Sequence, residues 1–368
     1  MDNLTHTLCG WLLSRAGFDR LGPWVPPVMM VSANLPDFET LIDPFASKPD
    51  YLMYHRGLSH SLIGAAVLSI GAAVLVWLIG WLLRKRIHEP PRILPALLVC
   101  FVGALSHLLL DWFNTYGVKF LLPYNDRRYF GDLAFIADPW MWLIAGGAIF
   151  AGTRRSRLQR NVFLFLAACT TAIMVQVARI GMIPSAAVGI WIVLLAMLVT
   201  LRITIFAARS PMVPARLGLL LWTVYVAALF LASRTSVSRA YESLKATGSH
   251  QTPGLRLAAN PVPAVPWRYE VIAYTQTSAE QISVNLIKGT AERHKQINPR
   301  LDHPGLAEIS ETPEYKAWRA FARFPVVTER NAALVLGDLR YRLTDRADWS
   351  EQSVPLTSST LLPRSLEK

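Results

Sequence analysis

The chain has 368 residues, 52% of them hydrophobic, and a mean hydropathy of +0.31, which excludes an ordinary soluble protein and predicts a polytopic membrane protein with a soluble part. The net charge of +12 suits either nucleic-acid binding or basic cytoplasmic loops, and we favour the loops because the basic residues recur between alternate apolar segments. The three cysteines lie in apolar stretches and form no Cys-x-x-Cys pair, so they suggest neither a disulfide framework nor a zinc ribbon.

The first 60 residues contain two short apolar pieces, 3–16 and 24–35, followed by a polar stretch, 36–59. Asn3 is a plausible helix cap before the first piece. Each piece is too short to span a bilayer, so we expect a shallow or partly buried hairpin. The start of the chain lacks the basic residues of a cleavable signal peptide, and we predict none.

Six apolar segments that follow are candidate membrane spans. They cover residues 62–83, 93–112, 133–151, 161–182, 184–206 and 215–233. Basic residues gather after the first, third and fifth of them. These residues are Arg84, Lys85, Arg86 and Arg92, then Arg154, Arg155, Arg157 and Arg160, then Arg202, Arg209 and Arg216. The positive-inside rule places all three loops in the cytoplasm, and the C-terminal region on the opposite side.

Residues 234–368 differ in composition, with many prolines and charges and no further span. We expect a Pro-rich linker over 234–266 and a soluble domain over 267–368. Aromatic and β-branched residues predict strands over 267–274, 282–288 and 332–343, and a helix is expected over 315–324. The predicted fold is mainly α. It comprises a polytopic helical membrane bundle over 1–233, with a metal site within 1–140, and a smaller C-terminal α+β or mostly β domain.

Four polar clusters in the first third of the chain carry side chains that bind metals. They contain His6, then Asp37, then His55 with His60, and finally His107 with Asp111. His107 and Asp111 are four residues apart, so they share one face of a helix and can reach one ion. Imidazole and carboxylate groups suit zinc, with manganese or iron as alternatives. Ionisable groups near a membrane helix are costly to bury, which favours a functional role.

Each of these residues also has a structural alternative. His6 is a plausible polar residue at a helix start, Asp37 after Pro36 is a common turn residue, and His107 with Asp111 could form only a buried ion pair. Asp132 and Asp138 flank the start of the third span, and Asp138 could cap a helix. We expect the six named histidines and aspartates to be ligands together, with Arg56 neutralising a phosphate.

These clusters, in this order, resemble a bacterial inner-membrane metal-dependent hydrolase family. The resemblance rests on Met1-Asp2-Asn3-Leu4-Thr5-His6, Leu35-Pro36-Asp37, His55-Arg56-Gly57-Leu58-Ser59-His60 and Ser106-His107 to Asp111, and it covers roughly residues 1–150. It implies a hydrolase in the inner (plasma) membrane without naming a substrate. The later segments Asn260-Pro261-Val262-Pro263 and Asp338-Leu339-Arg340-Tyr341 are also similar to longer members of that family.

A weaker resemblance links the chain to zinc-dependent phospholipase C and related single-strand nucleases. Those enzymes hold three zinc ions with His-x-x-x-Asp and His-x-x-x-Glu pairs. His107 and Asp111 match the first pair. No His-x-x-x-Glu pair lies at the end of a predicted membrane span in this chain. We therefore expect one or two ions.

The sequence thus predicts an integral membrane hydrolase that depends on a divalent metal and cleaves a phosphoester of a lipid-like substrate at the interface. Asp37 and Arg56 are the expected catalytic residues, and membrane lipids, not nucleic acid, are the expected partners. The alternative is a non-enzymatic membrane protein: a structural metal site, a scaffold or a transporter. Spans four to six carry few polar residues apart from Gln176 and Arg179, which disfavours a transporter.

Overall fold

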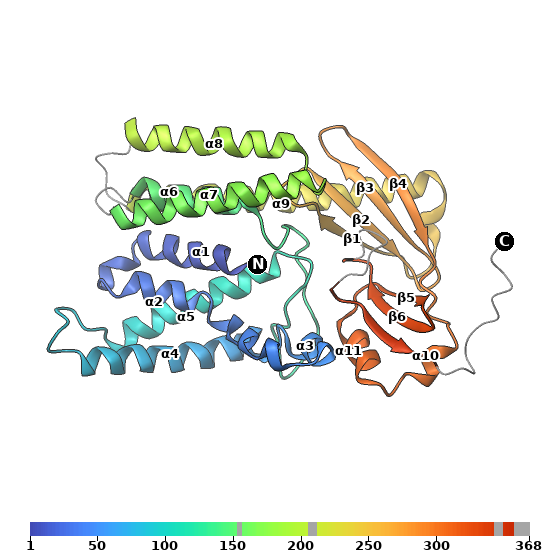
Figure 1. Cartoon of the computed structure of the whole chain (residues 1–368), viewed down its shortest axis with the longest axis horizontal. Coiled ribbons are helices and arrows are strands. Elements are labelled where there is room, and N and C mark those ends of the chain that lie inside the picture. Colours follow the sequence, from blue (N-terminus) through green and yellow to red (C-terminus); the bar gives the residue numbers. More distant parts are fainter. Residues whose placement is uncertain (153–156, 205–211, 342–348, 357–368) are drawn as a thin grey trace. The chain divides into compact units, whose positions relative to one another are not determined.

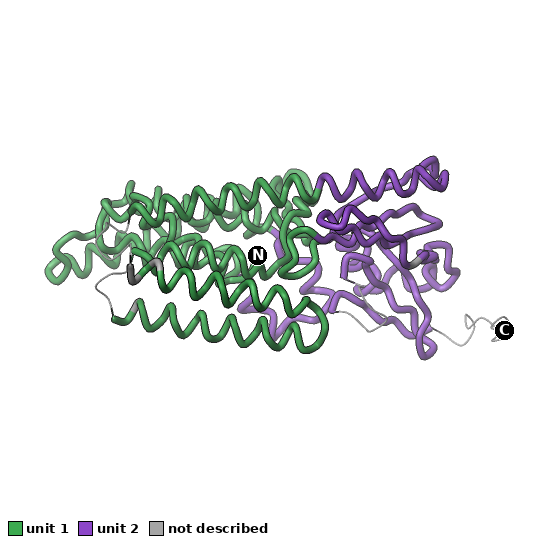
Figure 2. Tube along the Cα trace, turned by 90° about the horizontal axis from the view of Figure 1, so that it is seen from above, with its two compact units in different colours: residues 1–38, 58–233, 261–267 green, residues 39–57, 234–260, 268–368 purple. Residues whose placement is uncertain are grey.

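The computed structural model describes residues 1–152, 157–204, 212–341 and 349–356. The chain divides into two compact units, shown in different colours in Figure 2. The helical unit comprises residues 1–38, 58–233 and 261–267, and the sheet unit comprises residues 39–57, 234–260 and 268–368. A helical membrane bundle followed by a β-rich region confirms the predicted fold class.

The helical unit is built from eight α-helices among the described residues (Figure 1). They are α1 (Asn3–Arg15), α2 (Val25–Ser32), α4 (Leu62–Leu82), α5 (Ile93–Trp112), α6 (Pro139–Gly152), α7 (Arg157–Arg179), α8 (Ser185–Thr204) and the greater part of α9 (Met212–Ala246). Asp2, rather than the predicted Asn3, caps α1: its Oδ1 accepts a hydrogen bond from the Thr5 amide at 3.0 Å. A carboxylate at this position satisfies one of the free amides of the first turn.

Four helices in the described part of the chain are long and apolar enough to cross a membrane. They are Leu62–Leu82, Ile93–Trp112, Arg160–Arg179 and Met212–Ala246. The other two predicted spans correspond to shorter apolar helices, Pro139–Gly152 and Ser185–Thr200. The predicted third span began too early, because Leu133 lies in a loop where its amide binds the Phe113 carbonyl at 2.8 Å. Apolar residues of α4 such as Val67 and Leu75 are exposed, which suits a surface that faces lipid.

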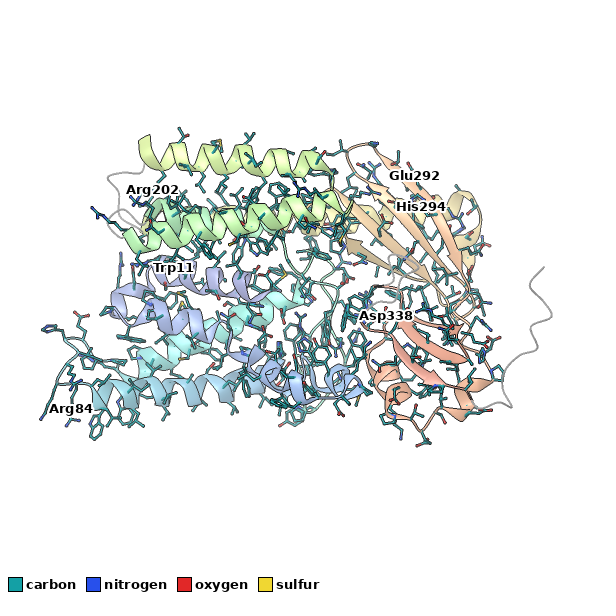
Figure 3. All side chains as sticks on the ribbon, viewed as in Figure 1. Trp11, Arg84, Arg202, Glu292, His294 and Asp338 are labelled. Atoms are coloured by element: carbon teal, nitrogen blue, oxygen red, sulfur yellow. The ribbon has the colours of Figure 1, made fainter. Side chains whose placement is uncertain are left out.

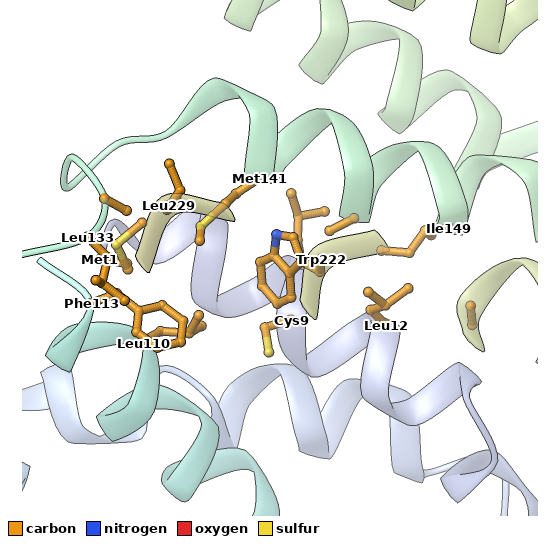
Figure 4. Packing of buried hydrophobic residues seen from close by; sticks show 14 residues of the cluster. Met1, Cys9, Leu12, Leu110, Phe113, Leu133, Met141, Ile149, Trp222 and Leu229 are labelled. Carbon is orange, nitrogen blue, oxygen red and sulfur yellow. The ribbon is translucent and has the colours of Figure 1, made fainter. Parts of the chain in front are cut away.

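The core of the helical unit surrounds α1. Side chains from α1, α5, α6 and α9 form one buried apolar cluster, in which Leu12 and Trp222 take part (Figure 4). Close packing on the other side of α1 depends on glycine: a Cβ on Gly10 would lie 2.7 Å from the Met29 carbonyl oxygen of α2. The short N-terminal hairpin is therefore a packed part of the bundle, and it can position side chains precisely.

The sheet unit contains two antiparallel sheets and two short helices from the C-terminal region. The first sheet has the order β1 (Arg256–Pro261), β2 (Arg268–Tyr274), β3 (Ala279–Asn285), β4 (Thr290–Ile297), and the second has the order β5 (Pro325–Arg330), β6 (Ala333–Asp338), β7 (Gln352–Pro355). The helices are α10 (Gly305–Glu308) and α11 (Pro313–Phe321). Ile272 and Val326 belong to a buried cluster shared by the two sheets, and Trp318 packs α11 against β5 and β6.

The region predicted as a linker, 234–266, has regular structure at both ends. Helix α9 continues to Ala246, and strand β1 begins at Arg256. A segment from the N-terminal half also belongs to the sheet unit: residues 39–57 contain helix α3 (Lys48–Tyr54), which packs against α11. The sequence order gives no indication that residues 39–57 belong to the sheet unit.

The topology of the helical unit leads to a first prediction. Figure 3 shows Arg84 and Arg202 at the same end of that unit, and the predicted loop residues Arg154, Arg155 and Arg209 lie outside the described residues. We expect reporter fusions after residues 88 and 157 to be cytoplasmic and a fusion after residue 240 to be non-cytoplasmic. Paired alkaline phosphatase and fluorescent reporters measure both locations, and a cytoplasmic signal from the fusion at 240 would contradict this topology.

Candidate metal centre

Four of the six predicted ligands converge in the helical unit. Asp37, His60, His107 and Asp111 each offer one donor atom, and these atoms all lie within 4.8 Å of one another. His60, His107 and Asp111 are fully buried, and the side chain of Asp37 is 10% exposed. Three separate pieces of chain supply the donors, so the site exists only in the folded protein. Asp37 forms its most accessible edge.

Helix α5 supplies two donors through its periodicity. His107 and Asp111 are one turn apart, and His107 Nε2 lies 3.6 Å from Asp111 Oδ2. One turn before His107, Gly103 allows α5 to approach α2, because a Cβ there would lie 2.7 Å from Ser32 Cβ. The close approach brings His107 Nδ1 to 2.8 Å from the Ala33 carbonyl oxygen. Glycine at 103 thus helps to fix the position of the imidazole.

The contacts of the two rings determine which nitrogen faces the centre. A carbonyl oxygen can only accept a hydrogen bond, so His107 Nδ1 carries a proton, and Nε2 is the nitrogen that faces the other donors and offers a lone pair once it is deprotonated. His60 sits just before helix α4, with its Nδ1 2.9 Å from Ser59 Oγ. The two Nε2 atoms are 3.1 Å apart. Such an outer contact, which fixes the ring and leaves Nε2 free to donate electrons, is typical of metal-binding histidines.

The spacing of the donors fits a first-row divalent ion. From His60 Nε2, Asp37 Oδ1 lies at 3.2 Å and Asp111 Oδ2 at 3.3 Å, and the distance from His107 Nε2 to Asp37 Oδ1 is 3.5 Å. Four ligands placed tetrahedrally around zinc at its usual bond lengths would be about 3.4 Å apart. Asp111, one of the two carboxylates, also forms an ion pair with the Met1 ammonium group through its Oδ1, and its Oδ2 is the oxygen that faces the two imidazoles. The residues therefore fit a metal, and nitrogen with oxygen donors suits zinc, manganese or iron.

Electrostatics around the centre favour the ionised form of Asp37. Burial acts to raise the pKa of this carboxyl, but hydrogen bonds from His107 and His60 outweigh it and hold the pKa below its usual range. A carboxylate that keeps its charge in a buried place is a good ligand for a cation.

His6 approaches the group from α1 without being one of the four. Its ring stacks on His107 with centroids 3.8 Å apart, and its Nε2 lies 3.3 Å from Asp111 Oδ1. Burial and the neighbouring His107 lower the pKa of His6 to about 3, so the ring is neutral at pH 7. Each oxygen of Asp111 therefore has its own partners. Oδ2 faces His60 and His107, and Oδ1 faces His6. This geometry suits a residue that orients Asp111.

The remaining predicted residues, His55 and Arg56, belong to the sheet unit. His55 Nδ1 lies 3.4 Å from Glu39 Oε1, and the same oxygen accepts the Arg56 amide at 2.6 Å. The His55 ring also stacks on Tyr51 at 4.7 Å. Their predicted roles as ligand and phosphate contact stay predictions. Glu39 was not assigned a role from the sequence, although it stands only two residues after Asp37.

Asp138 has the structural role that the sequence left open. Its Oδ1 accepts the Trp140 amide at 2.9 Å and its Oδ2 accepts the Tyr225 hydroxyl at 2.9 Å, so it caps α6 and ties it to α9. Burial raises its pKa to about 6, against the effect of these hydrogen bonds. Asp132, like Asp138, is not among the four grouped donors.

The stretch of chain that contains the donors is similar to a family of known proteins. Residues 1–180 match the family model described as YdjM inner membrane protein. The match includes α1 to α7 and all four grouped donors, and it supports a bacterial inner-membrane family for the helical unit. No curated protein and no solved structure matches the chain. The match and the four long apolar helices fit a bacterial inner-membrane protein, and its buried group of His and Asp residues could hold a metal ion.

Proposed function

We propose that the chain is an integral membrane hydrolase that depends on a divalent metal and cleaves a phosphoester of a lipid-like substrate at the membrane interface. The observation that carries this proposal is the convergence of Asp37, His60, His107 and Asp111 within 4.8 Å. A divalent ion held there would supply Lewis acidity to a phosphoryl oxygen and increase the acidity of water. The donor set lacks a thiolate, which favours hydrolysis over electron transfer.

The roles of the protein's own side chains follow from their burial. His60, His107 and Asp111 are fully buried and are held by further contacts, so they form the fixed part of the centre. Asp37 is the donor nearest to solvent, and it is ionised. We propose that it accepts a proton from an attacking water, because it is the donor that such a water can reach. Arg56 is proposed to bind the phosphate charge, as its residue type suits.

A lipid-like substrate is supported by the segment that follows Asp37. In the 3₁₀ helix over Leu35–Phe45, the side chains of Leu41 and Phe45 are 74% and 88% exposed. Exposed large apolar groups of this kind are typical of a segment that lies in a membrane interface. The segment follows the candidate ligand Asp37 directly in the chain.

The test uses purified full-length protein loaded with zinc, manganese or iron(II). We expect it to release phosphate or an alcohol from a phospholipid or isoprenoid phosphate faster than from an aryl phosphate, and chelation should abolish turnover. Asp37→Asn should lower kcat at least about 100-fold, the lower end of the range for one proton-transfer group. Ser47→Ala, which removes a cap of α3, is the matched control in the same stretch of chain.

A structural ion is the second candidate function, because the three fully buried donors could clamp α4 and α5 together. This alternative predicts no turnover of any phosphoester in the panel. It also predicts that metal removal lowers the melting temperature of the bundle strongly. Turnover that survives complete metal removal would exclude the proposed hydrolase mechanism.

A further inference from the structure

The sheet unit contains an open cavity of about 750 Å³ that none of the candidate metal donors lines. Its walls come from the start of β1, the turn between β2 and β3, and the region where α11 leads into β5. Three arginines line it: Arg256, Arg319 and Arg323. No acidic side chain lines the cavity among the described residues. The cavity is within the range of sizes that hold small molecules, and it is far larger than a single ion needs.

Aromatic rings hold the guanidinium groups in place. Arg256 lies 5.0 Å from the Tyr274 ring and 5.5 Å from the Phe324 ring, and Arg323 lies 5.1 Å from the Phe324 ring. Both rings are buried, and the Tyr274 hydroxyl donates to the Pro325 carbonyl at 2.8 Å, so the rings are fixed. Stacking occupies the face of a guanidinium and leaves its N–H edge available for an anion.

Other arginines of this unit have carboxylate partners. Arg293 pairs with Glu280, Arg340 with Asp338, Arg330 with Glu351 and Arg268 with Glu270. By contrast, Arg256 and Arg319 have no carboxylate partner among the residues that the structure describes. Arg319 instead lies 5.9 Å from the ring of Trp318, which is buried. Arg256 and Arg319 thus bring positive charge to the cavity that no described carboxylate neutralises.

We propose that this cavity binds a phosphate-bearing molecule through Arg256, Arg319 and Arg323. Planar guanidinium groups match phosphate oxygens with paired hydrogen bonds, which a lysine cannot reproduce. The hydroxyl and amide groups of Thr277 and Gln276 in the adjoining turn line the same cavity and suit the polar remainder of such a molecule. A phospholipid headgroup and a free phosphorylated metabolite share this chemistry. The site is independent of the proposed hydrolase activity.

The experiment titrates pyrophosphate into the purified full-length protein in neutral detergent by calorimetry. We expect binding by the wild type and at least a tenfold loss of affinity in the double variant Arg256→Gln/Arg319→Gln. The control Arg268→Gln removes the same charge from an exposed arginine of β2, and it should bind as the wild type does. The double variant Arg256→Lys/Arg319→Lys keeps the charge without the fork geometry and should lose affinity by several fold.

A second titration uses monomeric short-chain phosphatidic acid to distinguish the two sources. Tighter binding of the lipid than of pyrophosphate, lost in the Gln double variant, assigns a lipid headgroup, and the reverse order assigns a soluble phosphate compound. The melting temperature and metal content should not change in any variant; if the Gln variant fails to fold, the Lys variant gives the answer. The proposal is overturned if neither probe binds, or if Arg268→Gln weakens binding as much as the double variant.

Discussion

Replacing His107 or Asp111 by alanine is expected to remove nearly all of the metal that copurifies with the protein. Each side chain is fully buried and contributes one of four converging donors. Loss of an outer contact of a metal site already costs about 10- to 100-fold in affinity, so loss of a direct ligand should cost more than about 100-fold. Mass-spectrometric metal analysis of protein purified in detergent measures this effect.

The matched control lies on the same helix between the two donors. Leu109 is 52% exposed, so Leu109→Ala should retain the full metal content while changing one side chain of α5 by a comparable volume. We expect both ligand variants to insert and to elute as the wild type does in size-exclusion chromatography, because α5 keeps its apolar surface. Stoichiometric metal in both His107→Ala and Asp111→Ala would show that the ion is held elsewhere.

The donors that could be identified from the sequence are those fixed by local geometry. His107 and Asp111 meet because four residues make about one helical turn, and His60 is placed by the turn that precedes α4. Asp37 could be proposed as a ligand but not positioned, since its contact with His60 joins residues 23 positions apart. His6 was predicted as a ligand, whereas its contact with Asp111 Oδ1 depends on how α1 packs against α5.

The parts that could not be predicted depend on contacts that are distant in the chain. Strand propensity located β2 and β6 to within a few residues, because aromatic and β-branched residues mark them. The segments around Asn260 and Asp338, which resemble longer members of the family, contact each other in the sheet unit. Asn260 Nδ2 donates to the Arg340 carbonyl at 2.7 Å, and Arg340 pairs with Asp338 in a fully buried ion pair. The contact between Asn260 and Arg340, which are 80 positions apart, leaves no local signal in the sequence.

The inclusion of residues 39–57 in the sheet unit has a consequence for the metal centre. This segment leaves the helical unit just after Asp37 and returns just before His60, so it is the loop that joins two donors. Inside the sheet unit it is ordered by α3 packing on α11, by Tyr51 against Trp349, and by Glu39, which contacts both His55 and Arg56. Because this loop is already ordered, bringing Asp37 and His60 together costs little further conformational entropy.

Leu52→Ala is therefore expected to weaken metal binding although Leu52 is not one of the four donors. Leu52 lies in α3 and is 1% exposed, so its truncation should destabilise that helix by about 2–5 kcal/mol. With the loop disordered, bringing Asp37 and His60 together would require closing about 22 residues, at a cost of about 2.7 kcal/mol. We expect the metal dissociation constant to rise by between about tenfold and about a hundredfold, measured by competition with a chromophoric chelator. Leu41→Ala, at a 74% exposed position of the same segment, should leave it unchanged. If hydrogen exchange shows α3 melted in Leu52→Ala while metal affinity is unaltered, the sheet unit does not support the metal centre through this loop.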